Sequence, residues 1–110
     1  DLFFPYTYAV FGAMRDKDIA GILQHLKGEI DHWCVTNLPT PRGATAVELE
    51  AALREAGVAD GPDSSVQRFE SPAEAFQDAL KRVPDNGRIV VFGSFYTVAG
   101  VMAYRKSQQH

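Results

Sequence analysis

The stretch Arg88-Ile-Val-Val-Phe-Gly-Ser-Phe-Tyr-Thr-Val-Ala99 has the pattern of a strand that turns directly into a helix. Four apolar residues in succession, Ile89–Phe92, are typical of a parallel strand that is covered on both faces. Gly93 allows a sharp turn, and Ser94 then lies at or beside the helix N-cap, where free backbone N–H groups face outward. Because these donors and the helix dipole attract anions, the turn predicts a site for a carboxylate or phosphate beside Ser94. Serine is a favoured cap in any helix, so a capping role alone is the alternative.

Strand and helix patterns alternate along the whole chain. The expected strands are Tyr6–Phe11, a segment within Asp31–Thr36, Val66–Phe69 and Ile89–Phe92, each followed by a helical pattern. Four strand–helix units in succession predict an α/β fold, a mainly parallel sheet with helices on both faces. Right-handed crossovers bring the strand-to-helix turns to one edge of the sheet, where open α/β sheets bind ligands. The turns expected there are Gly12–Asp18, Asn37–Gly43 and Gly93–Thr97.

Local signals mark the expected helices. The first begins near Asp16, and its apolar stripe is Ile19, Ile22, Leu23, Leu26 and Ile30. The second begins with a Thr45/Glu48 capping box and ends at Gly57. The third begins at Ser71 and Pro72, and its inward positions are Phe76, Ala79, Leu80 and Val83. The last runs from about Tyr96 to Ser107, with Val98, Val101 and Met102 as its buried positions.

Length and composition exclude several classes of protein. With 110 residues we expect one domain, residues 1–110, and a net charge of −3 gives no electrostatic footprint for nucleic acid. The sequence has no apolar run long enough for a membrane span and no His/Cys/Asp cluster at metal-ligand spacing. Its single cysteine, Cys34, has no partner for an internal disulfide, which fits a cytoplasmic protein, and its apolar strand predicts a buried thiol.

Three motifs in order carry a resemblance to a known family. Phe11-Gly-Ala-Met-Arg-Asp-Lys-Asp-Ile-Ala20, Pro41-Arg-Gly-Ala-Thr45 and Phe92-Gly-Ser-Phe-Tyr-Thr-Val-Ala99 resemble the C-terminal domain of bacterial folylpolyglutamate synthase/dihydrofolate synthase. That enzyme belongs to the Mur ligase superfamily. The resemblance runs from about Ala9 to about Arg105, and it implies ATP-dependent addition of glutamate to dihydropteroate or folates through an acyl phosphate.

The resemblance also implies that this chain is one part of a two-domain enzyme. In the family, a larger N-terminal ATPase domain holds ATP and Mg²⁺ with a glycine-rich phosphate loop, and no G-x-x-x-x-G-K-[ST] sequence occurs here. We therefore expect a fragment that is inactive alone, with no catalytic residue, cofactor or metal ligand of its own. In the whole enzyme this smaller domain closes over the nucleotide and presents glutamate.

Site residues follow from the matching positions. The resemblance implies that Asp16 and Lys17 lie near the nucleotide in the closed enzyme, and that Ser94 binds or positions glutamate with Tyr96 nearby. Arg42 is a candidate clamp for a carboxylate, because a guanidinium pairs with carboxylates in a bidentate way. A solvated loop arginine is the alternative for Arg42.

One departure from the family pattern concerns the sheet. The family's first strand, its His-Asn-Pro turn and the helix that follows are absent from this sequence. A parallel sheet without that strand has an unpaired edge, and such an edge favours self-association.

Two other function classes share the size and the alternation of this chain. A free-standing α/β binding module would use the Gly93-Ser94 turn to hold an anionic metabolite or a partner's carboxylate. A phosphoacceptor receiver domain would need an acidic residue at the end of the third strand and a lysine at the end of a later one. Phe69-Glu70 and Phe92-Gly93 do not supply that pair, so the receiver ranks below the binding module.

Overall fold

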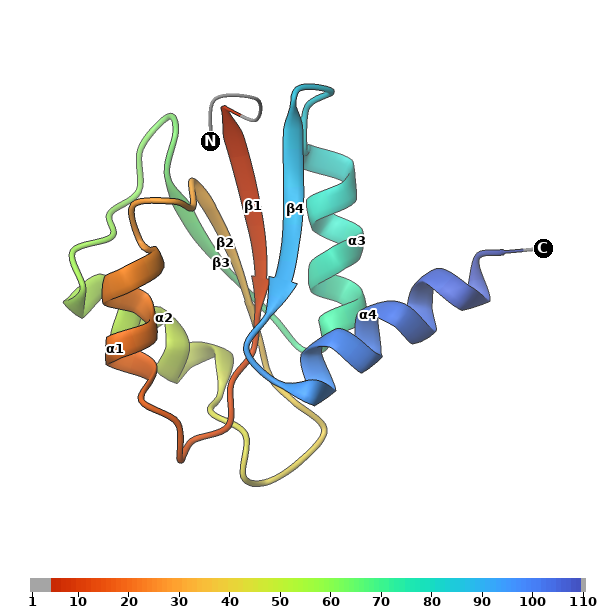
Figure 1. Cartoon of the computed structure of the whole chain (residues 1–110), viewed down its shortest axis with the longest axis horizontal. Helices are drawn as coiled ribbons and strands as arrows, with labels where there is room; N and C mark the ends of the chain where they lie inside the picture. The colour runs from red at the N-terminus through yellow and green to blue at the C-terminus, as the bar shows by residue number, and fades with distance from the viewer. Residues whose placement is uncertain (1–4, 110) are drawn as a thin grey trace.

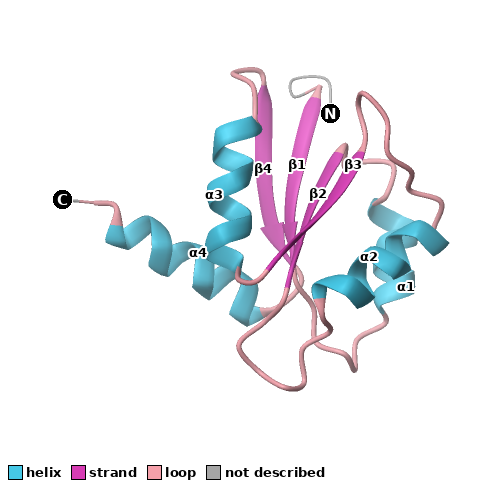
Figure 2. Cartoon of the chain, turned by 180° about the vertical axis from the view of Figure 1, so that it is seen from behind, coloured by secondary structure: helices cyan, strands magenta, loops and turns pink. Residues whose placement is uncertain are grey.

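The computed structural model describes residues 5–109 and shows four strand–helix units in succession (Figures 1 and 2). The strands are β1 (Tyr6–Phe11), β2 (His32–Thr36), β3 (Ser65–Phe69) and β4 (Gly87–Phe92). The helices are α1 (Ile19–Leu26), α2 (Ala46–Glu55), α3 (Pro72–Arg82) and α4 (Phe95–Ser107). The sheet has the order β3-β2-β1-β4, and every pair of neighbours is parallel, as the sequence predicts.

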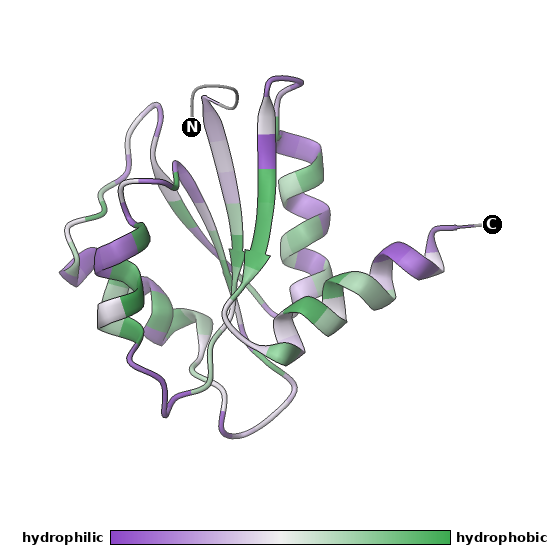
Figure 3. Cartoon of the chain, viewed as in Figure 1, coloured by the Kyte–Doolittle hydropathy of each residue, from purple (hydrophilic) through white to green (hydrophobic). Residues whose placement is uncertain are grey.

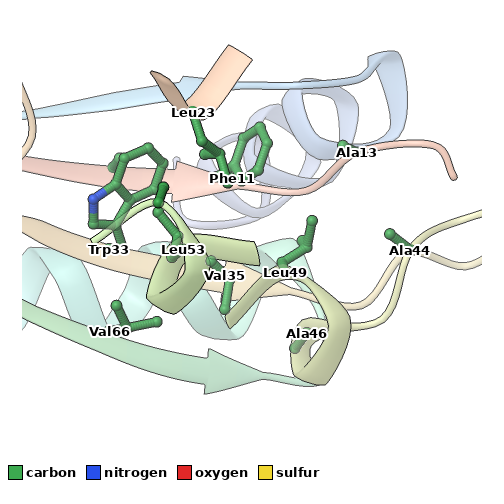
Figure 4. Close-up of a cluster of buried hydrophobic side chains, with 12 residues drawn as sticks. Phe11, Ala13, Leu23, Trp33, Val35, Ala44, Ala46, Leu49, Leu53 and Val66 are labelled. Atoms are coloured by element: carbon green, nitrogen blue, oxygen red, sulfur yellow. The ribbon is translucent and has the colours of Figure 1, made fainter. Parts of the chain in front are cut away.

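Helices cover both faces of the sheet, which confirms the predicted architecture (Figure 1). On one face, α1 and α2 enclose a cluster around Phe11, Trp33 and Val35 (Figure 4). On the other face, α3 and α4 pack over a second cluster that includes Cys34. Successive side chains of β2 therefore enter opposite layers, as the pleat of a strand requires.

The predicted helix ends are mostly present. Thr45 and Glu48 form the capping box: Glu48 N–H donates to Thr45 Oγ1 at 3.1 Å and Thr45 N–H donates to Glu48 Oε1 at 2.8 Å. Gly57 ends α2 with a φ of +98°, a conformation that favours glycine. Ser71 caps α3, which begins at Pro72. The first helix begins later than expected, because Asp18 rather than Asp16 accepts the first free N–H group.

The expected burial of α4 is wrong at two positions, and that of α3 at one. Met102 is 63% exposed, Val98 is also exposed, and Leu80 on α3 is 49% exposed. The cause is the line of contact between the helices: a Cβ on Gly100 would lie 2.9 Å from Pro72 Cβ, so α4 approaches α3 through Gly100. Its buried residues are therefore Thr97 and Val101, and Val98 and Met102 remain outside.

None of the helices that the structure describes combines the length and the apolar character that a membrane crossing needs.

Candidate functional site at the carboxyl edge of the sheet

The loops after β1 and β2 are joined at the carboxyl edge of the sheet, as predicted. Arg15 N–H donates to Arg42 O at 2.8 Å, and Ala44 N–H donates to Ala13 O at 2.9 Å. Met14 and Gly43 pair between these bonds as a short antiparallel bridge. The two loops therefore form one rim, although neither has regular structure along its length.

A surface hollow of about 330 Å³ lies on this rim and is lined by Arg15, Asp16, Pro41 and Arg42. Within residues 5–109, the Arg42 guanidinium has no hydrogen-bond or ion-pair partner, so its donors are available to a ligand. The structure thus brings together Asp16 and Arg42, which were predicted from separate motifs. Lys17 is exposed in the same turn as Asp16.

Sequence reasoning missed Arg15, the cation that fixes the shape of this hollow. Its Nη1 donates to Pro41 O at 3.1 Å, and its Nη2 donates to Glu48 Oε1 at 2.9 Å. Hydrogen bonds from Arg15 and from the Thr45 backbone hold the pKa of Glu48 below its ordinary value. Arg15 lies inside the first family motif, and this position in the sequence could have marked it as a candidate site residue.

The turn after β4 is pressed against the turn after β1. Gly93 has a φ of +114°, and a Cβ at this position would lie 2.2 Å from Gly12 O. The same atom would lie 2.9 Å from the Phe11 ring. Only glycine permits this approach of two backbones, because real Cβ atoms do not come so close to their neighbours.

Ser94 caps α4, so the capping role that was the alternative is present in the structure. Thr97 N–H donates to Ser94 Oγ at 3.1 Å, and Ser94 Oγ lies 2.8 Å from Thr97 Oγ1. Thr97 Oγ1 in turn donates to Gly12 O at 2.9 Å. Sequence reasoning missed Thr97, a polar residue at the third position of an apolar helix.

The first turn of α4 presents two aromatic side chains beside Ser94. Phe95 is 79% exposed, and its ring meets that of Tyr96 edge-on, with centroids 5.9 Å apart. Tyr96 is itself exposed. The candidate site therefore has two halves. One is the hollow of Arg15, Asp16, Pro41 and Arg42, formed by the loops after β1 and β2, and the other is the Ser94 turn after β4.

The site has the chemistry of anion binding. Within the part of the chain that the structure describes, no three His, Cys, Asp or Glu side chains lie close enough to hold a metal ion. The hollow offers guanidinium donors, and the Ser94 turn offers a hydroxyl at a helix N-terminus. Both groups favour a carboxylate or a phosphate.

Comparison with known proteins gives one consistent result. The model of the family described as Mur ligase, glutamate ligase domain, matches residues 3–95. A dihydrofolate synthase/folylpolyglutamate synthase of Escherichia coli K12 is 39% identical over 94 residues, which are 86% of this chain and 20% of that enzyme. The enzyme of the same name from Buchnera aphidicola of Schizaphis graminum is 36% identical over 98 residues, or 89% of this chain and 22% of that one. The chain thus spans about a fifth of the length of the curated relatives that it matches.

Solved structures agree with this result. E. coli FolC in complex with DHPP and ADP superposes with a TM-score of 0.83 and 35% identity, over 96% of this chain and 23% of FolC. A bifunctional folylpolyglutamate synthase/dihydrofolate synthase with Mn, AMPPNP and L-glutamate bound gives a TM-score of 0.78 and 32% identity, over 96% and 24% of the two chains.

Proposed function

The chain belongs to the Mur ligase family through its glutamate ligase domain, and we propose that it is the C-terminal domain of an ATP-dependent ligase. That ligase adds glutamate to dihydropteroate or to folates through an acyl phosphate, in the cytoplasm. Residues 1–110 form one domain of a longer two-domain enzyme. Its partner is an N-terminal ATPase domain, which supplies the phosphate loop and the Mg²⁺ ligands.

One observation supports the proposal above the others: the two glycine turns, at Gly12 and Gly93, meet at the carboxyl edge of the sheet. This contact puts the start of α4 beside the loop that carries Asp16. A ligase of this type must bring an amine and an activated carboxylate together, and two adjoining anion sites suit that task. The nucleotide and glutamate complexes of related enzymes support the same assignment.

We assign the residues as follows. Asp16 and Lys17 face the nucleotide, and the Lys17 ammonium offsets phosphate charge. Ser94, Tyr96 and Arg42 bind glutamate: the hydroxyl of Ser94 and the guanidinium of Arg42 donate to carboxylates, and the Tyr96 ring borders the site. In this proposal the Mg²⁺ ligands of the whole enzyme belong to the N-terminal domain.

The test uses a chimera in which this chain replaces the matching segment of the E. coli relative. Folate- and glutamate-dependent ADP release is measured with the wild-type segment, with Ser94→Ala and with Ser71→Ala. Ser71 is the matched control, because it caps α3 with the same geometry, Glu74 N–H donating to its Oγ at 3.2 Å. Each cap should contribute about 1 kcal/mol to stability.

Only Ser94→Ala should raise the KM for glutamate, and it should leave the KM for ATP nearly unchanged. Losing a hydrogen bond to a charged group costs about 1.5–3 kcal/mol, roughly a ten- to a hundred-fold change. If both variants lower the melting temperature and neither changes the KM for glutamate, Ser94 is a cap alone. A chimera without activity, beside an active E. coli parent, would contradict the ligase assignment.

The free-standing binding module is the second candidate, and the Arg42 guanidinium in the hollow, which has no partner among residues 5–109, favours it. The two functions differ in what the isolated chain does. As a ligase domain, the chain alone should release no ADP from ATP in the presence of folate and glutamate. As a binding module, it should bind an anionic metabolite tightly by calorimetry, with no need for a second domain.

We also propose that the isolated chain self-associates through the outer edge of β4. The two edges of the sheet differ: β3 carries exposed Gln67 and Arg68, whereas Ile89–Phe92 of β4 are apolar and half-buried on an open side (Figure 3). Edge strands of monomers are ordinarily protected by charges or prolines, and this part of β4 has neither. A second copy supplies the same apolar strand, and antiparallel pairing about Val90 sets Ile89 opposite Val91.

A further inference from the structure

Thr97 makes a hydrogen bond that joins the two halves of the candidate site. Its side chain is fully buried, and Oγ1 donates to Gly12 O at 2.9 Å across 85 positions of sequence. Gly12 ends β1 and begins the loop that carries Asp16, whereas Thr97 lies in the first turn of α4. A Cβ on Gly12 would lie 2.8 Å from Thr97 Oγ1, so no other side chain fits between them.

The same hydroxyl fixes the direction of the Ser94 hydroxyl. A carbonyl oxygen only accepts, so the single hydroxyl proton of Thr97 belongs to Gly12 O. The 2.8 Å contact between the two hydroxyls is then a bond in which Ser94 donates and Thr97 accepts. The Thr97 N–H donates a second hydrogen bond to the same Ser94 oxygen. Ser94 is therefore always a donor, and its proton can turn from Thr97 to a ligand without leaving any donor unpaired.

We propose that Thr97 is a positioning residue that locks the Gly12 turn to the Ser94 turn and keeps the Ser94 proton for an anionic ligand. A hydroxyl that can give its proton and keep every other donor satisfied suits a carboxylate oxygen, which only accepts. The consequence for glutamate rests on the proposed ligase function. The lock between the two turns does not, and it can be measured in the isolated chain.

The first experiment measures amide hydrogen exchange in the isolated chain for wild type, Thr97→Val, Thr97→Ser and Thr36→Val. Valine keeps the shape of threonine and removes the hydroxyl, and serine restores it. Thr36 is the matched control, because it is equally buried and, among the residues that the structure describes, its Oγ1 bonds only to the neighbouring Asn37 O at 2.8 Å. All rates are compared with those of amides in the central strand β1, which report global unfolding.

Thr97→Val should speed exchange of the Arg15 and Ala44 amides about two- to ten-fold beyond any global change, which corresponds to one hydrogen bond. These two amides hold the rim together, bonding to Arg42 O and Ala13 O. Thr97→Ser and Thr36→Val should leave them at the global rate. If Thr97→Val changes all amides equally, or if Thr36→Val has the same local effect, the lock does not exist and the inference is overturned.

The second experiment places the same variants in the chimera. Thr97→Val should raise the KM for glutamate and the KM for ATP together, about two- to ten-fold each, because it loosens both turns. A residue that only stabilises the fold would lower the active fraction, and hence kcat, with both KM values unchanged; that outcome would refute the positioning role. Rescue by Thr97→Ser supports it. If Ser94→Ala leaves the KM for glutamate unchanged, the glutamate assignment fails, and the exchange experiment still decides whether Thr97 locks the turns.

Discussion

Replacing Gly93 by alanine should destabilise the fold through two separate effects, and a matched glycine in the same chain separates them. The first effect is the backbone: Gly93 has a φ of +114° and Gly57 a φ of +98°, both unfavourable for alanine. This conformation costs a residue with a Cβ about 1–2 kcal/mol. Alanine recovers about 0.4–1 kcal/mol of that cost, because it lowers the conformational entropy of the unfolded chain. Gly57→Ala, whose Cβ would meet nothing within 4 Å, should therefore lose about 1 kcal/mol.

The second effect is the collision, which only Gly93→Ala experiences. Its Cβ would lie 2.2 Å from Gly12 O and 2.9 Å from the Phe11 ring, so the ends of β1 and β4 must separate. Forcing an extra methyl group into a packed site costs about 1–3 kcal/mol. The total for Gly93→Ala is then about 2–4 kcal/mol, a large part of the stability of a small domain.

Urea denaturation with linear extrapolation measures both variants and a third, Gly28→Ala. Gly28 has no positive φ, and its added Cβ meets nothing within 4 Å, so this change should be neutral or slightly stabilising. The reasoning is refuted if Gly93→Ala and Gly57→Ala lose the same free energy of unfolding. Equal losses would mean that the turns at Gly12 and Gly93 separate at no cost in free energy and that their contact does not shape the site.

Two further predictions concern the edge of the sheet and the buried thiol. Light scattering of the isolated chain should show a mass that rises with protein concentration. Val90→Lys on β4 should abolish the rise, and Gln67→Lys on β3 should not. A wild-type chain that stays monomeric at high concentration would contradict the edge proposal. Because burial raises the pKa of Cys34 from 9.0 to about 11, the folded state favours the neutral thiol, so the free energy of unfolding should fall as the pH rises from about 9 to 11. Cys34→Ala should lack that part of the slope, and an identical pH profile for the two proteins would show that the thiol titrates alike in both states.

Local chemistry made most of the fold predictable. Thr45 with Glu48, and Ser71 with Pro72, marked helix starts because each pattern satisfies free N–H groups within four residues of chain. The apolar run Ile89–Phe92 indicated a parallel strand, and the structure pairs it with β1 in parallel register. These features depend on neighbours in sequence, and such neighbours can be read without a structure.

The burial of α4 could not be predicted in the same way. A helix that is apolar on most of its surface offers several faces to its neighbours, and the sequence does not say which one is used. The choice depends on Gly100, which lets the helix approach Pro72 and turns Met102 outward. The hydrogen bond from Thr97 to Gly12 O could not be predicted either, because it joins residues 85 positions apart in the sequence.

The strand order explains why the two glycine turns form one site. The chain builds β1, β2 and β3 outward in one direction and then returns to add β4 on the other side of β1. The helices that follow β1 and β4 therefore leave toward opposite faces: α1 joins the cluster with Trp33, and α4 joins the one with Cys34. Such a reversal of strand order at the carboxyl edge of the sheet is the usual ligand site of an open α/β fold. Asp16 and Ser94 would thus approach a ligand from opposite faces of the sheet, and the bond between Thr97 and Gly12 is where these faces are held together. A substitution that loosens this bond should therefore raise the KM for ATP and the KM for glutamate, whereas a substitution at Arg42 or Ser94 should raise the KM for glutamate alone.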